Sequence, residues 1–225
     1  MSTKSGFGLA VGLALYAASS VTAAPDGADV VVVAETNGSF RTAAKYGDVQ
    51  VHVEWKEPDF SKANYNGYSR GRAQLFFGEF CSLYFHDSYR PRESFGAPAP
   101  ADRLAGAVTN EHCPLVNASR PSEAGQSFDV VFRQPRWEGT NLVFRGEMTA
   151  FLNGVLVQDK WAPQGGYSWL FRGRLAKPRS PKMKIALTNP TKGLLVRNFW
   201  IKELRDEPNC FFRCGRLVHC RLCGV

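Results

Sequence analysis

Three hydrogen-bonding side chains alternate with apolar ones along residues 47–55, which read GDVQVHVEW. Successive side chains of an extended strand point to opposite faces, so Gln50, His52 and Glu54 are predicted to share one face. An imidazole and a carboxylate placed together can move protons, and an amide beside them can hydrogen-bond to sugar hydroxyls. The same alternation is also typical of a face that is polar only because water covers it. These three residues are therefore candidates for binding or acid–base chemistry. The alternation by itself does not distinguish a functional face from a face that is only solvated.

The elements that position these side chains are predicted to be β-strands. Several short segments are rich in β-branched and aromatic residues, and Asn153-Gly154 is typical of a two-residue hairpin turn. Residues 88–126 and 159–166 have the composition of loops, and no convincing amphipathic helix follows the N-terminal segment. Short strands separated by turn signals predict an all-β sandwich or jelly roll. The predicted strands are 47–55, 73–86 with a turn or bulge at Gly78, 127–133, 142–151, 153–158, 167–173, 182–187 and 193–203.

The N-terminal residues are predicted to form a secretory signal. Lys4 precedes an apolar stretch from Phe7 to Tyr16, and Val21-Thr22-Ala23 fits the small-x-small cleavage rule. The stretch is too short to cross about 30 Å of hydrocarbon, and the alternatives are an interfacial anchor or a buried helix. We expect a secreted protein, extracellular or periplasmic, with no membrane segment after cleavage. The predicted organisation is a signal peptide over 1–23, one β domain over 24–205 and a Cys-rich basic tail over 206–225.

Composition narrows the range of partners. The chain has 225 residues, 28 Lys and Arg against 20 Asp and Glu, and a formal net charge of +8. A hydrophobic content of 44% excludes a disordered chain. The positive charge could attract polyanions such as acidic polysaccharide. Nucleic acid is not expected, because the chain carries a signal segment and lacks a motif that combines basic residues with stacking aromatics. The oligomeric state cannot be read from the sequence.

Six cysteines add a question of redox state. An oxidising compartment favours disulfides, and we predict them in the tail, where four cysteines crowd into CFFRCGRLVHCRLC. The alternatives are a zinc site that includes His219, or a poorly ordered tail. Pairing of Cys81 with Cys113 stays open. The tail cysteines are Cys210, Cys214, Cys220 and Cys223.

Six short motifs occur in order along roughly residues 38–204. They are YGDVQVHVEW at 46–55, DSY at 87–89, CPLVNASRP at 113–121, FRQPR at 132–136, NGVLVQD at 153–159 and RNFWI at 197–201. Together they resemble the 3-keto-disaccharide hydrolase domain family. The resemblance implies a concanavalin A-like jelly-roll β-sandwich of two antiparallel sheets, so the fold class is all-β.

The resemblance also implies a reaction. Enzymes similar to this family cleave an oligosaccharide or glycoside that is already oxidised to a ketone at sugar carbon 3. That ketone acidifies the proton on carbon 2, so a base can remove the proton while the group on carbon 1 leaves, and water can then add back. The chemistry needs a base, an electrophile on the ketone oxygen and an acid for the leaving oxygen. No cofactor is certain, although a divalent metal could polarise the ketone.

The family motifs suggest roles for individual residues. Glu54 matches an acidic position and is expected to be the base or a metal ligand, and His52 could share that role. Asp87 matches a further acidic position, while Arg197 and Asn198 are expected to hydrogen-bond to sugar or ketone oxygens. Each residue also has a structural alternative: Glu54 and Arg197 could form an ion pair, His52 could be a surface strand residue, and Asp87 could cap a turn.

The sequence departs from the family pattern in three places. The family's Gly-Asn-Ser-Gly is replaced here by Gly71-Arg72-Ala73-Gln74. Its acidic and amide positions on the next strand are replaced by Ser82 and Tyr84, and its Leu-Gln-Asp-His-Gly is replaced by residues 187–191. Tyr84 and His86 then share one face of their strand and could build a different site. Tyr84, His86 and Gln50 are therefore included among the expected substrate-binding residues.

Two functions follow from these observations. The first is a secreted hydrolase or lyase that acts on 3-keto-glycosides through Glu54, Asp87 and His52. The second is a catalytically inactive, lectin-like module that binds glycans or a partner on the same sandwich. The matching residues favour the first function, and the departures favour the second.

Overall fold

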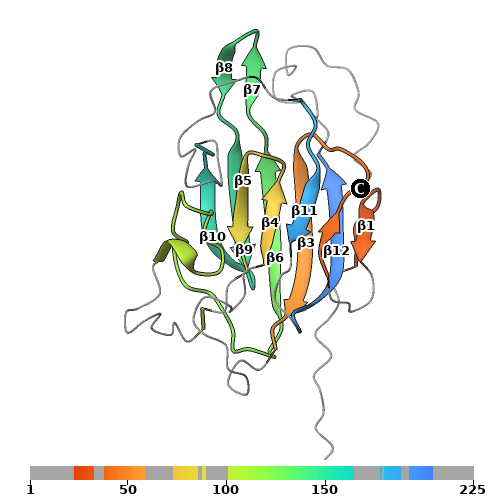
Figure 1. The fold of residues 1–225 in the computed structure, drawn as a ribbon, viewed down its shortest axis with the longest axis vertical. Coiled ribbons are helices and arrows are strands. Elements are labelled where there is room, and N and C mark those ends of the chain that lie inside the picture. Colours follow the sequence, from red (N-terminus) through yellow and green to blue (C-terminus); the bar gives the residue numbers. More distant parts are fainter. Residues whose placement is uncertain are drawn as a thin grey trace, which may run out of the picture.

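The structure is a computed structural model that describes residues 23–32, 38–58, 73–85, 88–89, 101–164, 178, 180–188 and 193–204. Within these ranges the regular elements are β-strands, apart from one 3₁₀ turn at Ala101–Arg103. The strands form two antiparallel sheets that pack as layers of a sandwich, and this confirms the predicted all-β jelly-roll class (Figure 1). In the part of the chain described here, no helix is long and apolar enough to span a bilayer.

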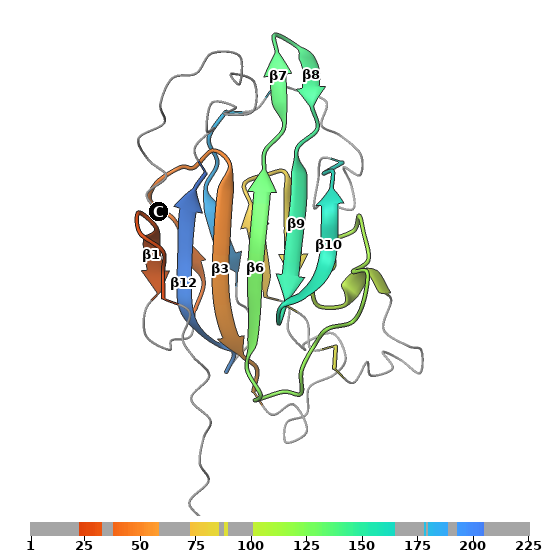
Figure 2. The ribbon, with the colours of Figure 1, turned by 180° about the vertical axis from the view of Figure 1, so that it is seen from behind.

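The larger sheet has six strands and forms one whole face of the molecule (Figure 2). A strand from the first quarter of the chain lies near its centre, between a strand from the middle and a strand from the end. Segments that are far apart in sequence therefore meet on one surface. In spatial order the strands are β1 (Asp29–Val32), β12 (Leu195–Glu203), β3 (Val49–Lys56), β6 (Gln126–Arg133), β9 (Glu147–Leu152) and β10 (Val155–Trp161).

The smaller sheet has four strands and forms the opposite layer, which faces the viewer in Figure 1. A separate two-stranded hairpin extends beyond the end of the larger sheet. The four strands, in spatial order, are β2 (Phe40–Arg41), β11 (Ile185–Thr188), β4 (Gln74–Phe77) and β5 (Cys81–Tyr84). The hairpin consists of β7 (Arg136–Glu138) and β8 (Asn141–Phe144).

The core fills the space between the two layers. Alternate side chains of each strand point inward, as the pleat requires, and they form one cluster that draws on both sheets. Aromatic rings make the contact between layers: the ring centroids of Phe77 on β4 and Phe132 on β6 lie 4.9 Å apart. Trp55 on β3 packs on Phe85 and Phe128, with centroids 4.3 Å and 4.9 Å away. This core fixes which face of each strand remains outside.

Several strand predictions need correction. Residues 142–151 are not one strand, because the chain breaks at Arg145 and Gly146 between β8 and β9. Part of the predicted loop 159–166 is strand, since β10 continues to Trp161. The short strands β1, β2 and β7 carried too little alternation to be predicted. The predicted strand 167–173, the signal segment through residue 22 and the tail from residue 205 lie outside the described residues.

Cys81 and Cys113 are both free thiols, so the bridge that the sequence left open does not form. Cys81 faces the core, and burial raises the pKa of its thiol well above the usual value. Cys113 is exposed. A buried thiol with a raised pKa is a poor nucleophile, so Cys81 acts as a packing residue.

The break at Gly146 leads to a stability prediction. Gly146 has a φ of +82°, and a Cβ atom there would lie 2.7 Å from the backbone oxygen of Arg133. Gly154, in the β9–β10 turn, has a φ of +80° but open space around the Cβ position. We expect Gly154→Ala to lower the free energy of unfolding by about 1–2 kcal/mol, from backbone strain alone.

Gly146→Ala introduces the same backbone strain and, in addition, a steric clash. It should therefore lower the free energy of unfolding by about 1–3 kcal/mol more than Gly154→Ala does. Urea denaturation of both variants, followed by tryptophan fluorescence, gives the comparison. Equal losses in the two variants would show that the close approach of the Arg133 carbonyl does not constrain this turn.

Candidate functional site

The candidate site lies on the outer face of the six-stranded sheet, on β3. Val51 and Val53 are fully buried in the core, so Gln50, His52 and Glu54 point to the other side, as the alternation predicts. β3 has a hydrogen-bonded neighbour on each side, β12 and β6. Each of its outward side chains can therefore contact residues from two other strands.

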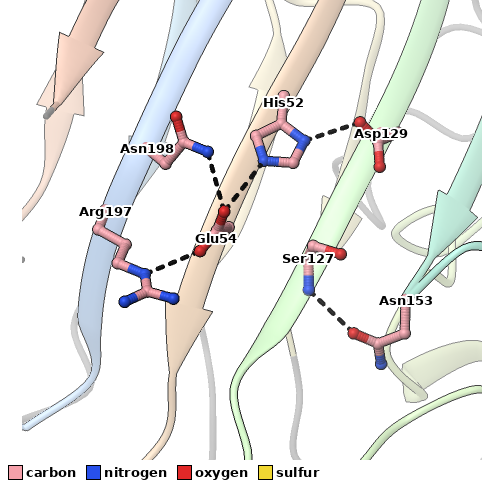
Figure 3. A network of polar contacts seen from close by, with 7 residues as sticks. All are labelled: His52, Glu54, Ser127, Asp129, Asn153, Arg197 and Asn198. Atoms are coloured by element: carbon pink, nitrogen blue, oxygen red, sulfur yellow. Dashed lines mark hydrogen bonds and ion pairs between the residues drawn. The ribbon is translucent and has the colours of Figure 1, made fainter. Parts of the chain in front are cut away.

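A bulge in β12 shapes the site on one side. Arg197 lies opposite Glu54 and Trp200 lies opposite His52, so β12 has one more residue than β3 between these pairs. The backbone of Asn198 has a φ of +45°, in the left-handed region that asparagine tolerates better than most residues. The bulge brings the side chains of two consecutive residues, Arg197 and Asn198, to the same carboxylate (Figure 3).

The carboxylate of Glu54 is held at both oxygens. Nε of Arg197 donates to Oε2 at 2.8 Å, and Nδ2 of Asn198 donates to Oε1 at 2.8 Å. Burial by itself would raise the pKa of Glu54. The hydrogen bonds from Asn198 and Arg197 and the Arg197 charge outweigh that effect, so the pKa lies below its ordinary value of 4.5. Glu54 is consequently ionised at neutral pH, and the ion pair considered as its structural alternative does form.

On the other side, His52 connects β3 to β6. Its Nδ1 lies 2.7 Å from Oδ1 of Asp129, and because an ionised carboxylate can only accept, Nδ1 carries the proton of this hydrogen bond. The other nitrogen, Nε2, lies 3.6 Å from Oε1 of Glu54, which is beyond hydrogen-bond distance. The imidazole stacks on Trp200, with centroids 5.3 Å apart and planes 16° apart. His52 is thus fixed in position by Asp129 and Trp200.

Accessibility differs sharply among these groups. The exposed fraction of the side chain is 3% for His52 and 13% for Glu54, but 37% for Arg197 and 41% for Asp129. The centre of the network is therefore buried, while a guanidinium on β12 and a carboxylate on β6 reach solvent on either side of it. A ligand on this face would meet Arg197 and Asp129 first.

A hairpin fixes the neighbouring end of β6. Oδ1 of Asn153, in the turn between β9 and β10, accepts from the backbone N–H of Ser127 at 2.9 Å (Figure 3). Its Nδ2 donates to the carbonyl of Ala118 at 2.9 Å and to Oε1 of Gln126 at 2.6 Å. These bonds fix the start of β6 two residues before Asp129. They stiffen the strand that presents the exposed carboxylate.

The structure brings together four of the residues expected from the sequence: His52, Glu54, Arg197 and Asn198. Gln50 lies on the same face of β3, beyond His52 and next to Lys202 in the strand register. Tyr84 does not join them, because it lies on β5 in the four-stranded sheet and points away from the core. His86 and Asp87 lie outside the described residues.

Two residues of the network were not expected from the sequence. Asp129 shares the outward face of residues 127–133 with Ser127, but its place opposite His52 depends on strand register, which alternation does not specify. Trp200 reaches this face only because of the bulge at Asn198. An unbroken alternation from Arg197 would turn Trp200 toward the core.

The departures from the family pattern fall elsewhere. Gln74 begins β4 and Ala73 directly precedes it, Ser82 and Tyr84 lie on β5, and Leu187 lies on β11. The Ser82 hydroxyl is buried and donates to Oγ1 of Thr109 at 2.8 Å. Among described residues, all of these departures lie in the four-stranded sheet or directly beside one of its strands. None of these positions contacts Glu54 or His52 in the network.

The described residues of the site do not fit a metal ion. Glu54, expected to be the base or a metal ligand, uses both oxygens to accept hydrogen bonds, and the Arg197 cation lies beside it. Across the described ranges, no group of three or more His, Cys, Asp or Glu side chains is arranged to hold a metal.

Comparison with known proteins identifies the family. The model of the 3-keto-alpha-glucoside-1,2-lyase-like domain matches residues 16–202. A crystal structure of a proposed glycosyl hydrolase from Parabacteroides distasonis is 24% identical, with a TM-score of 0.64, and the match covers 80% of this chain and 73% of that one. A second proposed glycosyl hydrolase from that organism is 16% identical, with a TM-score of 0.50 and coverage of 80% and 88%. At these identities the likeness shows a shared fold.

No curated protein matches the sequence. The family match nevertheless spans most of the chain and includes β3, β6 and β12, which carry the network around Glu54. The chain is a carbohydrate-active β-sandwich domain that belongs to the 3-keto-alpha-glucoside-1,2-lyase-like family.

Proposed function

We propose that this chain is a secreted enzyme that cleaves glycosides carrying a ketone at sugar carbon 3. The observation that supports this most directly is the pair of accessible, oppositely charged groups, Asp129 and Arg197, on either side of the buried His52–Glu54 centre. The apolar segment from Phe7 to Tyr16 supports secretion. An enolisation reaction needs a base and an electrophile, and this face offers one of each.

In the proposed reaction, Asp129 is the base. One of its oxygens bonds to His52 and its side chain is 41% exposed, whereas both oxygens of Glu54 are occupied. The carboxylate takes the proton from carbon 2, and the released electron pair forms the enolate of the carbon 3 ketone. The enolate then collapses to a double bond between carbons 1 and 2 as the bond to the leaving oxygen breaks. The protonated Asp129 can return its proton to that oxygen, and addition of water completes a hydrolysis.

Arg197 is the electrophile in this proposal. Its Nε donates to Glu54, and this hydrogen bond fixes the orientation of the planar guanidinium. The side chain is nevertheless 37% exposed, so a ligand can reach it. A guanidinium held in this way can donate to the ketone oxygen and stabilise the negative charge that develops on it. Glu54 is then a positioning residue that orients Arg197 and Asn198. His52 plays the same part for Asp129.

The second candidate function is a lectin-like module without turnover. It is favoured by the two oxygens of Glu54, which are both engaged, and by the loss of acidic and amide residues at Ser82 and Tyr84. The same accessible groups would then hydrogen-bond to a glycan without moving a proton. Turnover separates the two functions.

Turnover of a 3-keto-glucoside is the direct test of the proposed reaction. The purified protein should release the aglycone from an aryl 3-keto-α-glucoside and should not act on the parent glucoside, which lacks the acidified proton. Asp129→Asn should lower kcat by about 10²–10⁴-fold, the usual contribution of a positioned base. Reactions with and without added divalent metal should be run in parallel. Glu138→Gln on the β7–β8 hairpin is the matched control, because Glu138 is an exposed carboxylate away from β3, β6 and β12.

If a folded wild-type protein shows no turnover of any 3-keto-glucoside, with or without metal, the enzyme proposal fails and the lectin-like module replaces it. If Asp129→Asn retains full activity while Glu54→Gln loses it, the base is Glu54 instead.

A lysine at position 197 tests the role of the Arg197 guanidinium. A lysine in its place has one nitrogen, which cannot bond to Glu54 as Nε does and also present a planar pair of donors to the substrate. Arg197→Lys should therefore lower kcat by at least about tenfold, with a smaller effect on KM, because the lost donor acts mainly on charge that develops in the transition state. Arg145→Lys, an exposed residue outside the network, is the control. An unchanged kcat would show that Arg197 does not touch the reacting oxygen.

The lowered pKa of Glu54 should make the stability of the fold depend on pH. The folded-state pKa of Glu54 lies below its ordinary value of 4.5, so its ionised form stabilises the fold above that pH, and the contribution is lost as pH falls through the lowered pKa. Glu54→Gln should lower the free energy of unfolding by about 1–3 kcal/mol at pH 7, because it removes the carboxylate that pairs with Arg197. The difference in free energy of unfolding between the wild type and Glu54→Gln should shrink as pH falls below 4.5. Urea unfolding of both proteins at pH 7 and pH 3.5 measures this difference. If it is the same at the two pH values, the pKa of Glu54 is not lowered in the folded state.

A further inference from the structure

A second surface feature lies on the opposite side of the sandwich from the Glu54 network. It is a groove of about 820 Å³ on the outer face of the four-stranded sheet, the layer nearest the viewer in Figure 1. β2, β4 and β11 contribute to it, together with the segments that precede β11 and follow β2. The sandwich core separates this groove from β3, β6 and β12.

The strand register defines the floor of the groove. Ile185 and Leu187 on β11 are fully buried, so Ala186 between them points outward. Ala186 pairs with Arg41 on β2 and with Phe76 on β4, and residues directly opposite each other share a face. A cation, a small residue and an aromatic ring therefore lie in one row across three strands. The small side chain leaves a depression between the other two.

Cations line the groove. Arg41, Lys45, Lys182 and Lys184 all border it, and Glu79 is its one acidic lining residue among those described. Lys182 is paired with Glu203, at 3.1 Å. The other three cations make no ion pair with any described carboxylate. The groove therefore presents a local excess of positive charge beside an aromatic ring.

We propose that this groove binds an acidic polysaccharide, a chain of sugars that carry carboxylate groups. The cations suit the carboxylates, and the partly exposed ring of Phe76 suits the apolar face of a sugar. Thr188 also lines the groove and adds a hydroxyl that can bond to a sugar hydroxyl. Because the groove and the Glu54 network lie on opposite faces, the protein can bind such a polymer and keep the Glu54 face accessible.

Nucleic acid is the competing occupant, and the observations favour the glycan. Single-stranded nucleic acid is bound by successive aromatic platforms, whereas the groove has Phe76 in its floor and Phe40 partly packed against the core. The chain also belongs to a carbohydrate-active family. The proposal does not depend on turnover at Asp129.

Affinity electrophoresis in gels that contain polygalacturonate tests the proposal, with dextran as a neutral polymer. Wild-type protein should be retarded by polygalacturonate and not by dextran. The double variant Arg41→Gln/Lys184→Gln should bind polygalacturonate about tenfold more weakly at low salt, and the wild-type affinity should fall as salt rises. Phe76→Leu keeps the charge and should also weaken binding.

The matched control is Arg120→Gln/Arg145→Gln, which removes the same charge from exposed positions that do not line the groove. If both double variants lose affinity equally, attraction is a property of the net charge and the proposal is wrong. If both double variants bind polygalacturonate as tightly as the wild type, the binding site lies elsewhere, for example on the basic tail over 206–225. That result would also overturn the proposal. Tighter binding to a single-stranded DNA oligonucleotide than to polygalacturonate would exclude the glycan. Asp129→Asn should bind as wild type does, which keeps this test separate from the test of catalysis.

Discussion

The pairing of Glu54 with the bulged strand β12 is the interaction on which the rest of the site depends. The carboxylate is only 13% exposed and is compensated by a guanidinium and an amide from consecutive residues. A charge buried to this extent destabilises the fold unless it is paired and hydrogen-bonded. The register of β3 against β12 is thus constrained by electrostatics as well as by the pleat. A slip of one residue would turn Glu54 toward the core.

From this anchor the network extends across three strands. His52 follows Glu54 on the same face of β3, stacks on Trp200 of β12 and bonds to Asp129 of β6. Rigid strands hold each group, and Asn153 fixes the end of β6 through its backbone. The result is a buried, ordered centre flanked by a carboxylate and a guanidinium that reach solvent. Preorganisation of this kind lets charged groups act without reorganising first.

The two faces of the sandwich carry different chemistry. The six-stranded sheet presents the network that contains Glu54, and its strands lie within the family match. The four-stranded sheet carries the described departures from the family pattern, along with a group of cations beside Phe76. A sandwich permits this division because its packed core separates the outer faces, so residues on one face can change without disturbing the other.

The sequence by itself determined the all-β class and the outward face of residues 47–55. Its motifs also proposed Glu54, His52, Arg197 and Asn198 as candidate site residues, and the structure places these four side chains together. These follow from alternation and local motifs, which are properties of short segments. Tertiary structure decided the rest. Asp129 meets His52 across 77 positions of sequence, and Trp200 faces outward only because the backbone of Asn198 adopts a φ of +45°. Register and bulges arise from pairing between distant strands, and no local pattern encodes that pairing.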